Sequence, residues 1–397
     1  MLALWLVTAL TATAGVIDYY RRIRRPRAAA ETAPKVAILV PVKGAARSLT
    51  DFLEAIARQD YPAFRVVFAV EAADDPALAV LRAFPRDGRD TETVVAGPAE
   101  GRGQKVHNLL AALSRLRPDD ALVVFADSDI EPTPHWLRQL VRPVLRGVAG
   151  ASSGYRWQIP GDGALPTRAL AAADWSIATS GRSTRWNLCW GGSTALERGL
   201  LDRLDLPRWW RHSASDDLSL TAALRHSRER IYAPLELLVP STARQDWRGL
   251  LAFGRRQYLM CRTYATGHWL LAGWTLAVPA FGAVAGVAGA AAGDSLALAA
   301  LAAVVSLAEL RHAVRRAIVR LILGPDEIAR IRPGERLACW AFPIVHLVHL
   351  SCFLGSLYGR RFRWAGIEYR FRGRRVEVLS RDAGALPRAA DVERCRY

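Results

Sequence analysis

Short apolar runs alternate with helically spaced apolar positions between residues 35 and 126. The short runs are rich in Val, Ile and Phe, which is typical of strands buried in a sheet. The predicted strands are Lys35–Val42, Phe64–Val70, Thr93–Ala96 and Ala121–Ala126, and the predicted helices are Leu49–Arg58, Ala77–Phe84 and Val106–Leu116. This alternation favours an α/β fold with a mostly parallel sheet. Ligands bind at the carboxyl ends of such strands, so the polar residues that follow them are candidates for a site.

Longer apolar segments lie in the first and last parts of the chain. Leu2–Ile17 carries no charge, although it is short for a full membrane span of about 20 residues. Trp269–Leu310 is long enough for two spans with an outer turn at Gly293-Asp294, and its many Gly and Ala residues allow close helix packing. Leu337–Tyr358 is another candidate, either as a span or as a re-entrant or interfacial segment.

The charges beside these segments predict an orientation. The first apolar segment is followed by Arg21, Arg22, Arg24, Arg25 and Arg27. A cleaved signal peptide would carry its positive charges before the apolar run. We therefore expect an uncleaved anchor with its N-terminus outside and the rest of the chain on the cytosolic side. Arg311–Arg332 mixes Ile, Val and Leu with arginines at helical spacing, which predicts an amphipathic helix on the inner leaflet.

Charge and cysteine content narrow the function classes. The chain of 397 residues has a net charge of +17 that rests on arginine, since Lys35, Lys43 and Lys105 are the only lysines. Basic side chains near a membrane are attracted to anionic headgroups by about 1 kcal/mol each. The arginines flank apolar segments instead of gathering on one soluble face, so no nucleic-acid partner is predicted. The five cysteines show no CxxC pair and no zinc-ligand spacing.

Two pairs of aspartates follow predicted strands. Asp127 and Asp129 come directly after the strand that ends at Ala126, and two carboxylates at this spacing suit Mg²⁺ or Mn²⁺. An Asp-rich turn would explain the same pattern without a function. Asp74 and Asp75 follow the second strand, where the alternative is a helix N-cap.

A third pair of aspartates and two of the lysines complete the candidate chemistry. Asp216 and Asp217 precede a helical pattern, where one of them can act as a general base while the pair also caps the helix. Lys105 lies in a glycine-bearing loop that leads into a helix, an arrangement that can bind phosphate through backbone N–H groups and a lysine. Lys43 follows the first strand.

Together and in this order, these pieces resemble the inverting glycosyltransferases of family 2. They are more similar still to the ceramide glucosyltransferase family, family 21, and its bacterial relatives. The motifs that carry the resemblance are Pro41-Val42-Lys43-Gly44, Asp60-Tyr61-Pro62, Asp74-Asp75-Pro76-Ala77, Lys105 with Asn108, and Asp127-Ser128. The resemblance covers most of the chain, and the joint order of the motifs is more specific than any one of them.

The resemblance implies a GT-A fold and roles for the matching residues. Asp75 and Asp127 correspond to the first two signature aspartates. The third, usually in a Glu-Asp pair, is Asp216-Asp217 here, and the spacing to the following leucines favours Asp217 as the base. Donor binding would involve Lys43, Asp74, Asp75, Lys105 and Asp127, and the metal would be held by Asp127 and Asp129.

Two departures from the family pattern stand out. The late motif (Gln/Arg)-x-x-Arg-Trp is replaced by Gly254-Arg255-Arg256-Gln257-Tyr258, whose basic, amide and aromatic side chains are still expected to bind the donor diphosphate. Asp129 completes a full DxD where animal ceramide enzymes lack the second aspartate, which strengthens the metal prediction.

The implied organisation is an N-terminal membrane anchor at 1–20, a GT-A glycosyltransferase domain at 35–255, and a C-terminal membrane region at 265–397 with an amphipathic cytosolic helix and a basic tail. The expected activity is inverting transfer of a hexose from a UDP-sugar to a membrane lipid hydroxyl, such as a ceramide-like lipid, a hopanoid or diacylglycerol. The expected place is the cytosolic face of a bacterial inner membrane, in a multi-pass protein. Alternatives are a processive polysaccharide synthase, a polyprenyl-phosphate sugar transferase and a non-catalytic membrane scaffold.

Overall fold

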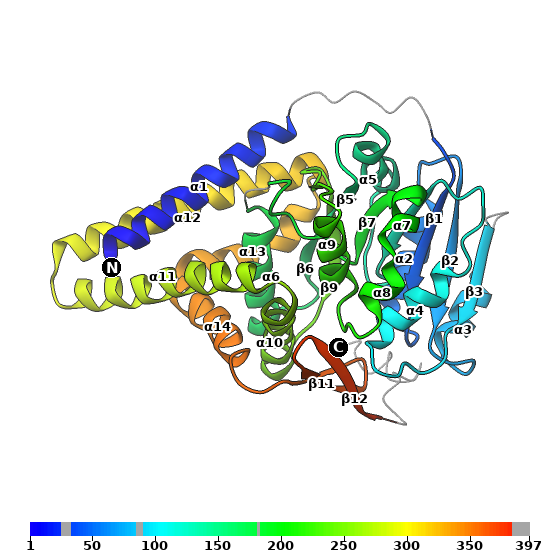
Figure 1. Cartoon of the computed structure of the whole chain (residues 1–397). Helices are drawn as coiled ribbons and strands as arrows, with labels where there is room; N and C mark the ends of the chain where they lie inside the picture. Colours follow the sequence, from blue (N-terminus) through cyan, green and yellow to red (C-terminus); the bar gives the residue numbers. More distant parts are fainter. Residues whose placement is uncertain (25–32, 85–89, 181–182, 383–397) are drawn as a thin grey trace. The chain divides into compact units, whose positions relative to one another are not determined.

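The structure, a computed structural model, describes residues 1–24, 33–84, 90–180 and 183–382 (Figure 1). The chain forms two compact units. The sheet unit comprises Ala28–Tyr155, Arg182–Pro240 and Arg360–Tyr397, and the helical unit comprises Met1–Arg27, Arg156–Gly181 and Ser241–Gly359. The predicted basic positions Arg25 and Arg27, and the end of the basic tail, lie outside the described residues.

The sheet unit is built on a seven-stranded sheet with the order β3-β2-β1-β4-β7-β5-β8. Its strands are β1 Val36–Pro41, β2 Phe64–Val70, β3 Asp90–Val95, β4 Leu122–Ala126, β5 Ala151–Ser153, β7 Ser193–Glu197 and β8 Ile231–Tyr232. The first four strands are parallel, whereas β7 runs antiparallel to both β4 and β5. Strands β6 Tyr155–Pro160 and β9 Leu238–Ala243 pair separately. The predicted α/β class with a mostly parallel sheet is confirmed.

Helices cover both faces of this sheet because its central strands are apolar on both sides. Along β1, Val36, Ile38 and Val40 belong to one buried cluster, and Ala37 and Leu39 belong to the other. The first cluster includes α2 Arg47–Ala57, α3 Ala77–Ala83 and α5 Trp136–Leu145. The second includes α4 Gln104–Leu113, α7 Arg198–Leu204, α8 Leu206–Trp210 and α9 Asp216–His226. The predicted strands and helices up to β4 therefore form, with ends shifted by a few residues.

The sheet unit also contains a small antiparallel sheet near the end of the chain. It consists of β10 Arg361–Trp364, β11 Ile367–Arg372 and β12 Arg375–Arg381. Phe362 stacks on Tyr369 and packs against Phe371, so one face is aromatic while arginines alternate on the other. The sequence predicts only a basic tail here, because the arginines mask the two-residue alternation that is typical of strands.

The helical unit contains the long apolar segments. Its helices are α1 Leu2–Ile23, α6 Leu165–Ala178, α10 Trp247–Tyr264, α11 Thr266–Ala291, α12 Ser295–Ile322, α13 Glu327–Trp340 and α14 Phe342–Gly355. α1 packs along α12 and α11 (Figure 1). Trp5 lies against Gly282 and Gly286 of α11, and a Cβ at Gly286 would come within 2.7 Å of the indole. The predicted close packing through small residues is therefore present.

Three helices, α1, α11 and α12, are long and apolar enough to cross a membrane, in the part of the chain that the structure describes. The predicted turn at Gly293-Asp294 is also present, because Asp294 accepts a hydrogen bond of 2.9 Å from the N–H of Leu296 and caps α12. Leu270, Trp274 and Leu298 remain exposed, as apolar side chains that face lipid would be.

One of the two predictions for the C-terminal segments differs from the structure. A single amphipathic helix over Arg311–Arg332 does not form, since α12 ends at Ile322 and Gly324, with a φ of 101°, and Pro325 follow it. For the apolar segment Leu337–Tyr358 the prediction is a span or a re-entrant or interfacial segment. It is shared by α13 and α14, which are bent by 93° at their junction, so a broken span or a re-entrant loop describes it.

Candidate active site

Polar side chains gather at the carboxyl ends of the parallel strands of the sheet unit. Lys43 follows β1, Glu71 follows β2 and Asp127 follows β4. The register of β1 with both β2 and β4 places these strand ends at the same edge of the sheet. The first turns of α4 and α9 add Lys105 and Asp216 to this group. The edge that the sequence pattern indicated is therefore where the candidate residues meet.

Lys105 is the central cation of this cluster. Its Nζ lies 2.7 Å from Oδ1 of Asp127 and 3.2 Å from Oδ1 of Asp216. The three side chains are 15%, 25% and 6% exposed, so the cluster is largely shielded from water. Burial alone would lower the pKa of Lys105, but the charges of Asp127, Asp216 and Asp217 outweigh it and raise that pKa. Lys105 is thus a permanent positive charge.

Asp216 is the buried member of the third aspartate pair. Burial raises its pKa to about 7, against the opposing charge of Lys105, and the neighbouring carboxylates of Asp217 and Asp127 act in the same direction as burial. A Cβ at Gly191 would collide with the carboxylate of Asp216 and come within 2.7 Å of Nζ of Lys105. Glycine at position 191 is therefore a steric requirement of the Lys105–Asp216 pair.

Asp217 is more accessible than Asp216 and is held by three donors. Its Oδ2 accepts a hydrogen bond of 3.4 Å from the N–H of Gly191. Its Oδ1 accepts from Oγ of Ser215 at 2.5 Å and from the N–H of Leu218 at 2.7 Å. Ser215 is the N-cap of α9 and accepts from the same N–H of Leu218 at 3.2 Å, so the serine and Asp217 share the predicted capping role. Asp217 is left partly exposed and firmly oriented.

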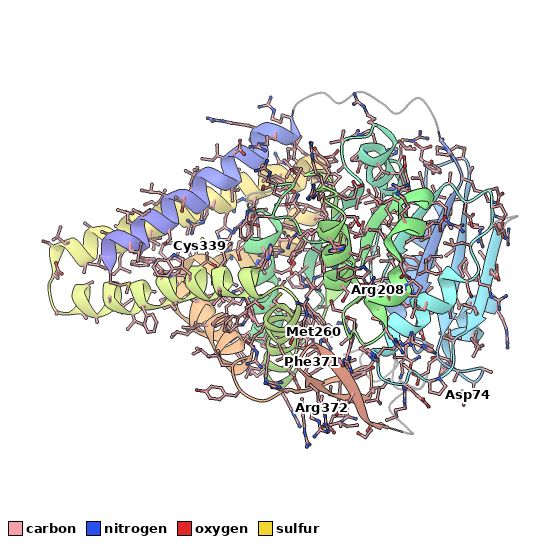
Figure 2. All side chains as sticks on the ribbon, in the orientation of Figure 1. Asp74, Arg208, Met260, Cys339, Phe371 and Arg372 are labelled. Carbon is pink, nitrogen blue, oxygen red and sulfur yellow. The ribbon has the colours of Figure 1, made fainter. Side chains whose placement is uncertain are left out.

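Asp74 and Asp75, the pair that follows β2, differ in burial and in contacts. Asp75 is 3% exposed, and its Oδ1 accepts hydrogen bonds of 2.9 Å from the N–H groups of Gly44 and Ala77. It therefore binds the first N–H of α3, whose N-cap residue is Pro76, and ties the loop after β1 to it. Asp74 is exposed (Figure 2).

A second charged group, which the sequence analysis did not select, lies at the ends of β1 and β2. Glu71 Oε2 lies 2.7 Å from Nζ of Lys43, and Glu71 Oε1 pairs with the guanidinium of Arg381. Arg381 also donates to Oε1 of Gln104 at 3.0 Å and to the carbonyl of Ala99 at 2.7 Å. The small C-terminal sheet thus contributes a cation to the strand-end cluster of its own unit.

The sequence carries a signal for Glu71 as a site residue but none for Arg381. Glu71 directly follows a predicted buried strand, and this position is a usable signal. Arg381 lies far along the chain in an arginine-rich stretch, so nothing in the local pattern separates it from its neighbours. The hydroxyl of Tyr369 accepts a hydrogen bond of 3.2 Å from the N–H of Gln104, which anchors the same sheet beside α4.

The predicted metal ligands suit a hard divalent cation whose coordination shell is completed by substrate oxygens. Asp127 and Asp129 are two residues apart in the turn after β4, and Asp129 is exposed. No group of three or more His, Cys, Asp or Glu side chains that could hold a metal occurs among the described residues. Two carboxylates are nevertheless a normal protein contribution to Mg²⁺, which keeps several waters and binds substrate phosphates. The donor set therefore fits the predicted cation.

The altered late motif belongs to the helical unit, whereas the carboxylates and both lysines belong to the sheet unit. Arg255 donates to the carbonyl of Gly355 at 2.9 Å and to that of Tyr358 at 2.8 Å, which fastens α10 to the end of α14. The guanidinium of Arg256 lies 5.3 Å from the ring centroid of Phe253. The hydroxyl of Tyr258 is hydrogen-bonded to His349 of α14, and Gln257 is exposed.

The chain is similar to one known protein family and to several solved structures. The model for glycosyl transferase family 21 matches residues 3–376. The structure is similar to a mannosyltransferase of Pyrobaculum calidifontis in complex with GDP-Man and Mn²⁺, at 18% identity and a TM-score of 0.47, over 90% of this chain and 99% of that one. It is also similar to TarS residues 1–349 of S. aureus in complex with UDP-GlcNAc, at 13% identity and a TM-score of 0.38, over 88% and 100% of the two chains.

A third similar structure is glucosyl-3-phosphoglycerate synthase of Mycobacterium tuberculosis in complex with Mn²⁺, UDP and phosphoglyceric acid. The identity is 18% and the TM-score 0.37, over 61% of this chain and 81% of that one. All three TM-scores lie below 0.5, so no residue role is transferred from these proteins. The family match rests on the sequence and spans nearly the whole chain.

The family match and the observed sheet agree with the resemblance that the motifs indicated. The α/β unit with its mostly parallel sheet is of the GT-A type, and helices apolar enough to span a membrane lie near the N-terminus and toward the C-terminus. The predicted membership of the ceramide glucosyltransferase family is confirmed. The chain is a glycosyltransferase and belongs to glycosyl transferase family 21.

Proposed function

We propose that the protein transfers a hexose from a UDP-sugar to a hydroxyl group of a membrane lipid, with inversion at the anomeric carbon. The observation that supports this most directly is the bridge that Lys105 makes between Asp127 and Asp216. It joins the DxD turn to the aspartate pair that would act on the acceptor. A donor diphosphate at this bridge would have a lysine beside it and the candidate base within the same group of residues.

The residues at the strand ends have proposed roles in binding the metal and the donor. Asp127 and Asp129 would hold Mg²⁺ or Mn²⁺. The bound cation would neutralise negative charge on the leaving diphosphate. Lys105 and Lys43 would bind phosphate oxygens, and Asp75 would shape the loop after β1 through its bond to Gly44.

Asp217 is the proposed general base. It would accept the proton of the lipid hydroxyl while that oxygen forms its bond to the anomeric carbon, and the bond from that carbon to the UDP oxygen breaks. The products are the glycolipid, UDP and a protonated Asp217. A single displacement from an α-linked donor gives a β-linked product. The hydrogen bonds from Gly191, Ser215 and Leu218 would hold the carboxylate in place for this step.

The proposed acceptor and location rest on the helical unit. Three helices long and apolar enough to cross a membrane, or up to four if the bent α13–α14 pair counts as one, occur in the part of the chain that the structure describes. Apolar residues on these helices are exposed, for example Leu270 and Leu298. We propose a multi-pass protein of a bacterial inner membrane whose sheet unit faces the cytosol and meets a lipid acceptor there.

The test is transfer in membranes that contain the protein, with radiolabelled UDP-sugars and a total lipid extract. A chloroform-soluble product that requires Mg²⁺ or Mn²⁺ and disappears with EDTA is expected. Label found only in insoluble polymer would replace this proposal with a processive synthase. Absence of both product and metal-dependent nucleotide binding would favour a non-catalytic scaffold. An Asp217→Asn variant serves as the inactive control.

A further inference from the structure

The C-terminal end of α9 carries a second polar site, away from the carboxylates at its N-terminal end. A cavity of about 480 Å³ opens there, within the size range of small-molecule sites. Four of its lining side chains are arginines: Arg185, Arg225, Arg228 and Arg230. A helix of 11 residues is roughly 16 Å long, so this cavity is separate from the cluster around Asp216.

The four lining arginines are exposed, and no acidic partner of theirs is found among the described residues. No ion pair or side-chain hydrogen bond of Arg185, Arg228 or Arg230 occurs within the part of the chain that the structure describes. The one acidic residue of the lining is Glu229, and its carboxylate lies against Gly150, where a Cβ would come within 2.5 Å of it. Four guanidinium groups around one cavity repel one another, and an anion bound among them would relieve that repulsion.

Arg225 also lines the cavity, and its side chain is exposed. Its Nη2 donates to the carbonyls of Trp186 and Asn187, at 3.3 and 3.2 Å. These acceptors are neutral carbonyls, and partial desolvation lowers the pKa of Arg225. A bound anion would supply the missing negative charge and restore it.

The backbone at Arg228 argues against a purely structural reason for an arginine at this position. α9 ends in a Schellman motif, in which the N–H of Glu229 donates to the carbonyl of Leu224 and the N–H of Arg228 to that of Arg225. Arg228 occupies the left-handed position of this motif, with a φ of 59°, where glycine is favoured. Arginine therefore costs backbone energy at this position. A basic side chain complements the helix dipole, but it does not require this strained position.

We propose that this cavity binds a phosphate-bearing anion, which is either the headgroup of an anionic phospholipid or a soluble phosphate. Arginine forks match the geometry of phosphate oxygens. The side chain of Trp186, beside Arg225, is 59% exposed, and tryptophan together with arginine is typical of side chains that meet lipid headgroups. The experiment below separates the two sources.

The variants are chosen so that charge loss can be separated from loss of folding. Arg185→Gln, Arg228→Gln and Arg230→Gln are combined in one variant. Its matched control combines Arg58→Gln, Arg82→Gln and Arg208→Gln, which remove three exposed arginines of the same unit outside the cavity; Arg208 lies on α8 (Figure 2). Arg228→Gly is a third variant. Because glycine suits the left-handed position, it should leave the melting temperature unchanged or raise it by about 2 °C while weakening binding.

Binding is measured on the full-length protein in a neutral detergent. One arm counts phosphatidylglycerol and phosphatidylcholine molecules retained from mixed micelles by native mass spectrometry. The other arm titrates inorganic phosphate by calorimetry at constant ionic strength. We expect saturable binding in at least one arm, weakened at least about tenfold in the triple cavity variant and unchanged in the control.

The two arms assign the source. If the wild-type protein retains phosphatidylglycerol selectively and the cavity variant does not, the ligand is a lipid headgroup. If the cavity variant loses phosphate binding and lipid retention is unchanged, the ligand is a soluble phosphate. Either result supports the proposal. Affinities that agree within about twofold between the cavity variant and its control in both arms would overturn it, as would an absence of saturable binding to the wild-type protein.

Discussion

Nζ of Lys105 lies 2.7 Å from Oδ1 of Asp127, so the start of α4 and the end of β4 are joined by an ion pair inside the candidate active site. The same ammonium group lies 3.2 Å from Asp216 at the start of α9. One cation thereby sets the spacing of two carboxylates that would otherwise repel each other. Lys105 therefore holds the two acidic ends of the candidate site together.

Lys105→Met should abolish measurable transfer and weaken donor binding. Methionine fills a similar volume but leaves Asp127 and Asp216 without their shared cation, and breaking a buried pair in this way costs roughly 3–5 kcal/mol. Thermal unfolding and nucleotide titration of the purified variant check both effects. An active Lys105→Met enzyme with wild-type affinity for UDP would contradict the phosphate-binding role.

Asp217→Asn should reduce turnover by roughly 10²–10⁴-fold, the range for loss of a general base, while donor binding stays near the wild-type level. The amide keeps the shape of the carboxylate but accepts no proton. Turnover number and UDP affinity are measured on the same preparation. If UDP affinity falls as far as turnover, Asp217 binds the donor and the base must be sought elsewhere.

Gly191→Ala should impair both stability and transfer, because the added methyl group would overlap the carboxylate of Asp216 and crowd Lys105. Overpacking of this kind costs about 1–3 kcal/mol. Gly199→Ala in α7 is the matched control, since only the end of Arg203 lies near its Cβ, at 3.7 Å. Thermal melts of the two variants should move in opposite directions, as alanine is favoured over glycine within a helix.

Arg381→Ala should raise the KM for the donor by about tenfold, equivalent to about 1.4 kcal/mol, with a smaller change in kcat. Without Arg381, Glu71 is released from one of its two cations and Gln104 loses a donor, so Lys43 and the start of α4 are less well held. Arg372→Ala, on β11 of the same small sheet (Figure 2), removes an exposed arginine paired with Glu377 and should leave the KM unchanged. Equal effects of the two substitutions would assign Arg381 a general structural role.

Asp120→Asn should destabilise the sheet unit and remove part of its acid sensitivity. The fully buried Arg65 donates to both carboxylate oxygens of Asp120, at 2.9 Å to Oδ1 and 2.7 Å to Oδ2. Burial opposes ionisation of Asp120, but the hydrogen bonds from Arg65 and the N–H of Arg117 outweigh it and lower the pKa of this carboxyl.

Because the folded pKa lies below the unfolded one, near 4, the stabilisation is fully present above pH 4 and is lost as the pH falls through the folded value. The asparagine variant should melt at a lower temperature at pH 7, and its melting temperature should fall less than that of the wild-type protein between pH 5 and pH 3. Parallel curves for the two proteins would remove Asp120 as a source of the acid sensitivity.

The sequence by itself determined the strands and helices up to β4, because their burial and periodicity are local properties. It also indicated the edge at which Asp127 would lie, since parallel strands present their carboxyl ends together. The apolar segments and the turn at Gly293-Asp294 were readable for the same reason. Family membership followed from motifs whose order along the chain needs no coordinates.

Only the tertiary structure decided which side chains meet. Nothing local separates Arg381 from the other arginines near the end of the chain, and the strand that carries it shows its alternation only once β11 and β12 pair. The cavity at the end of α9 exists only because residues 184–185 and 225–231, which are about 40 positions apart in the sequence, line it together. Contacts between residues far apart in sequence depend on side-chain packing and on the desolvation of charged groups. The local pattern of residues along the chain contains neither.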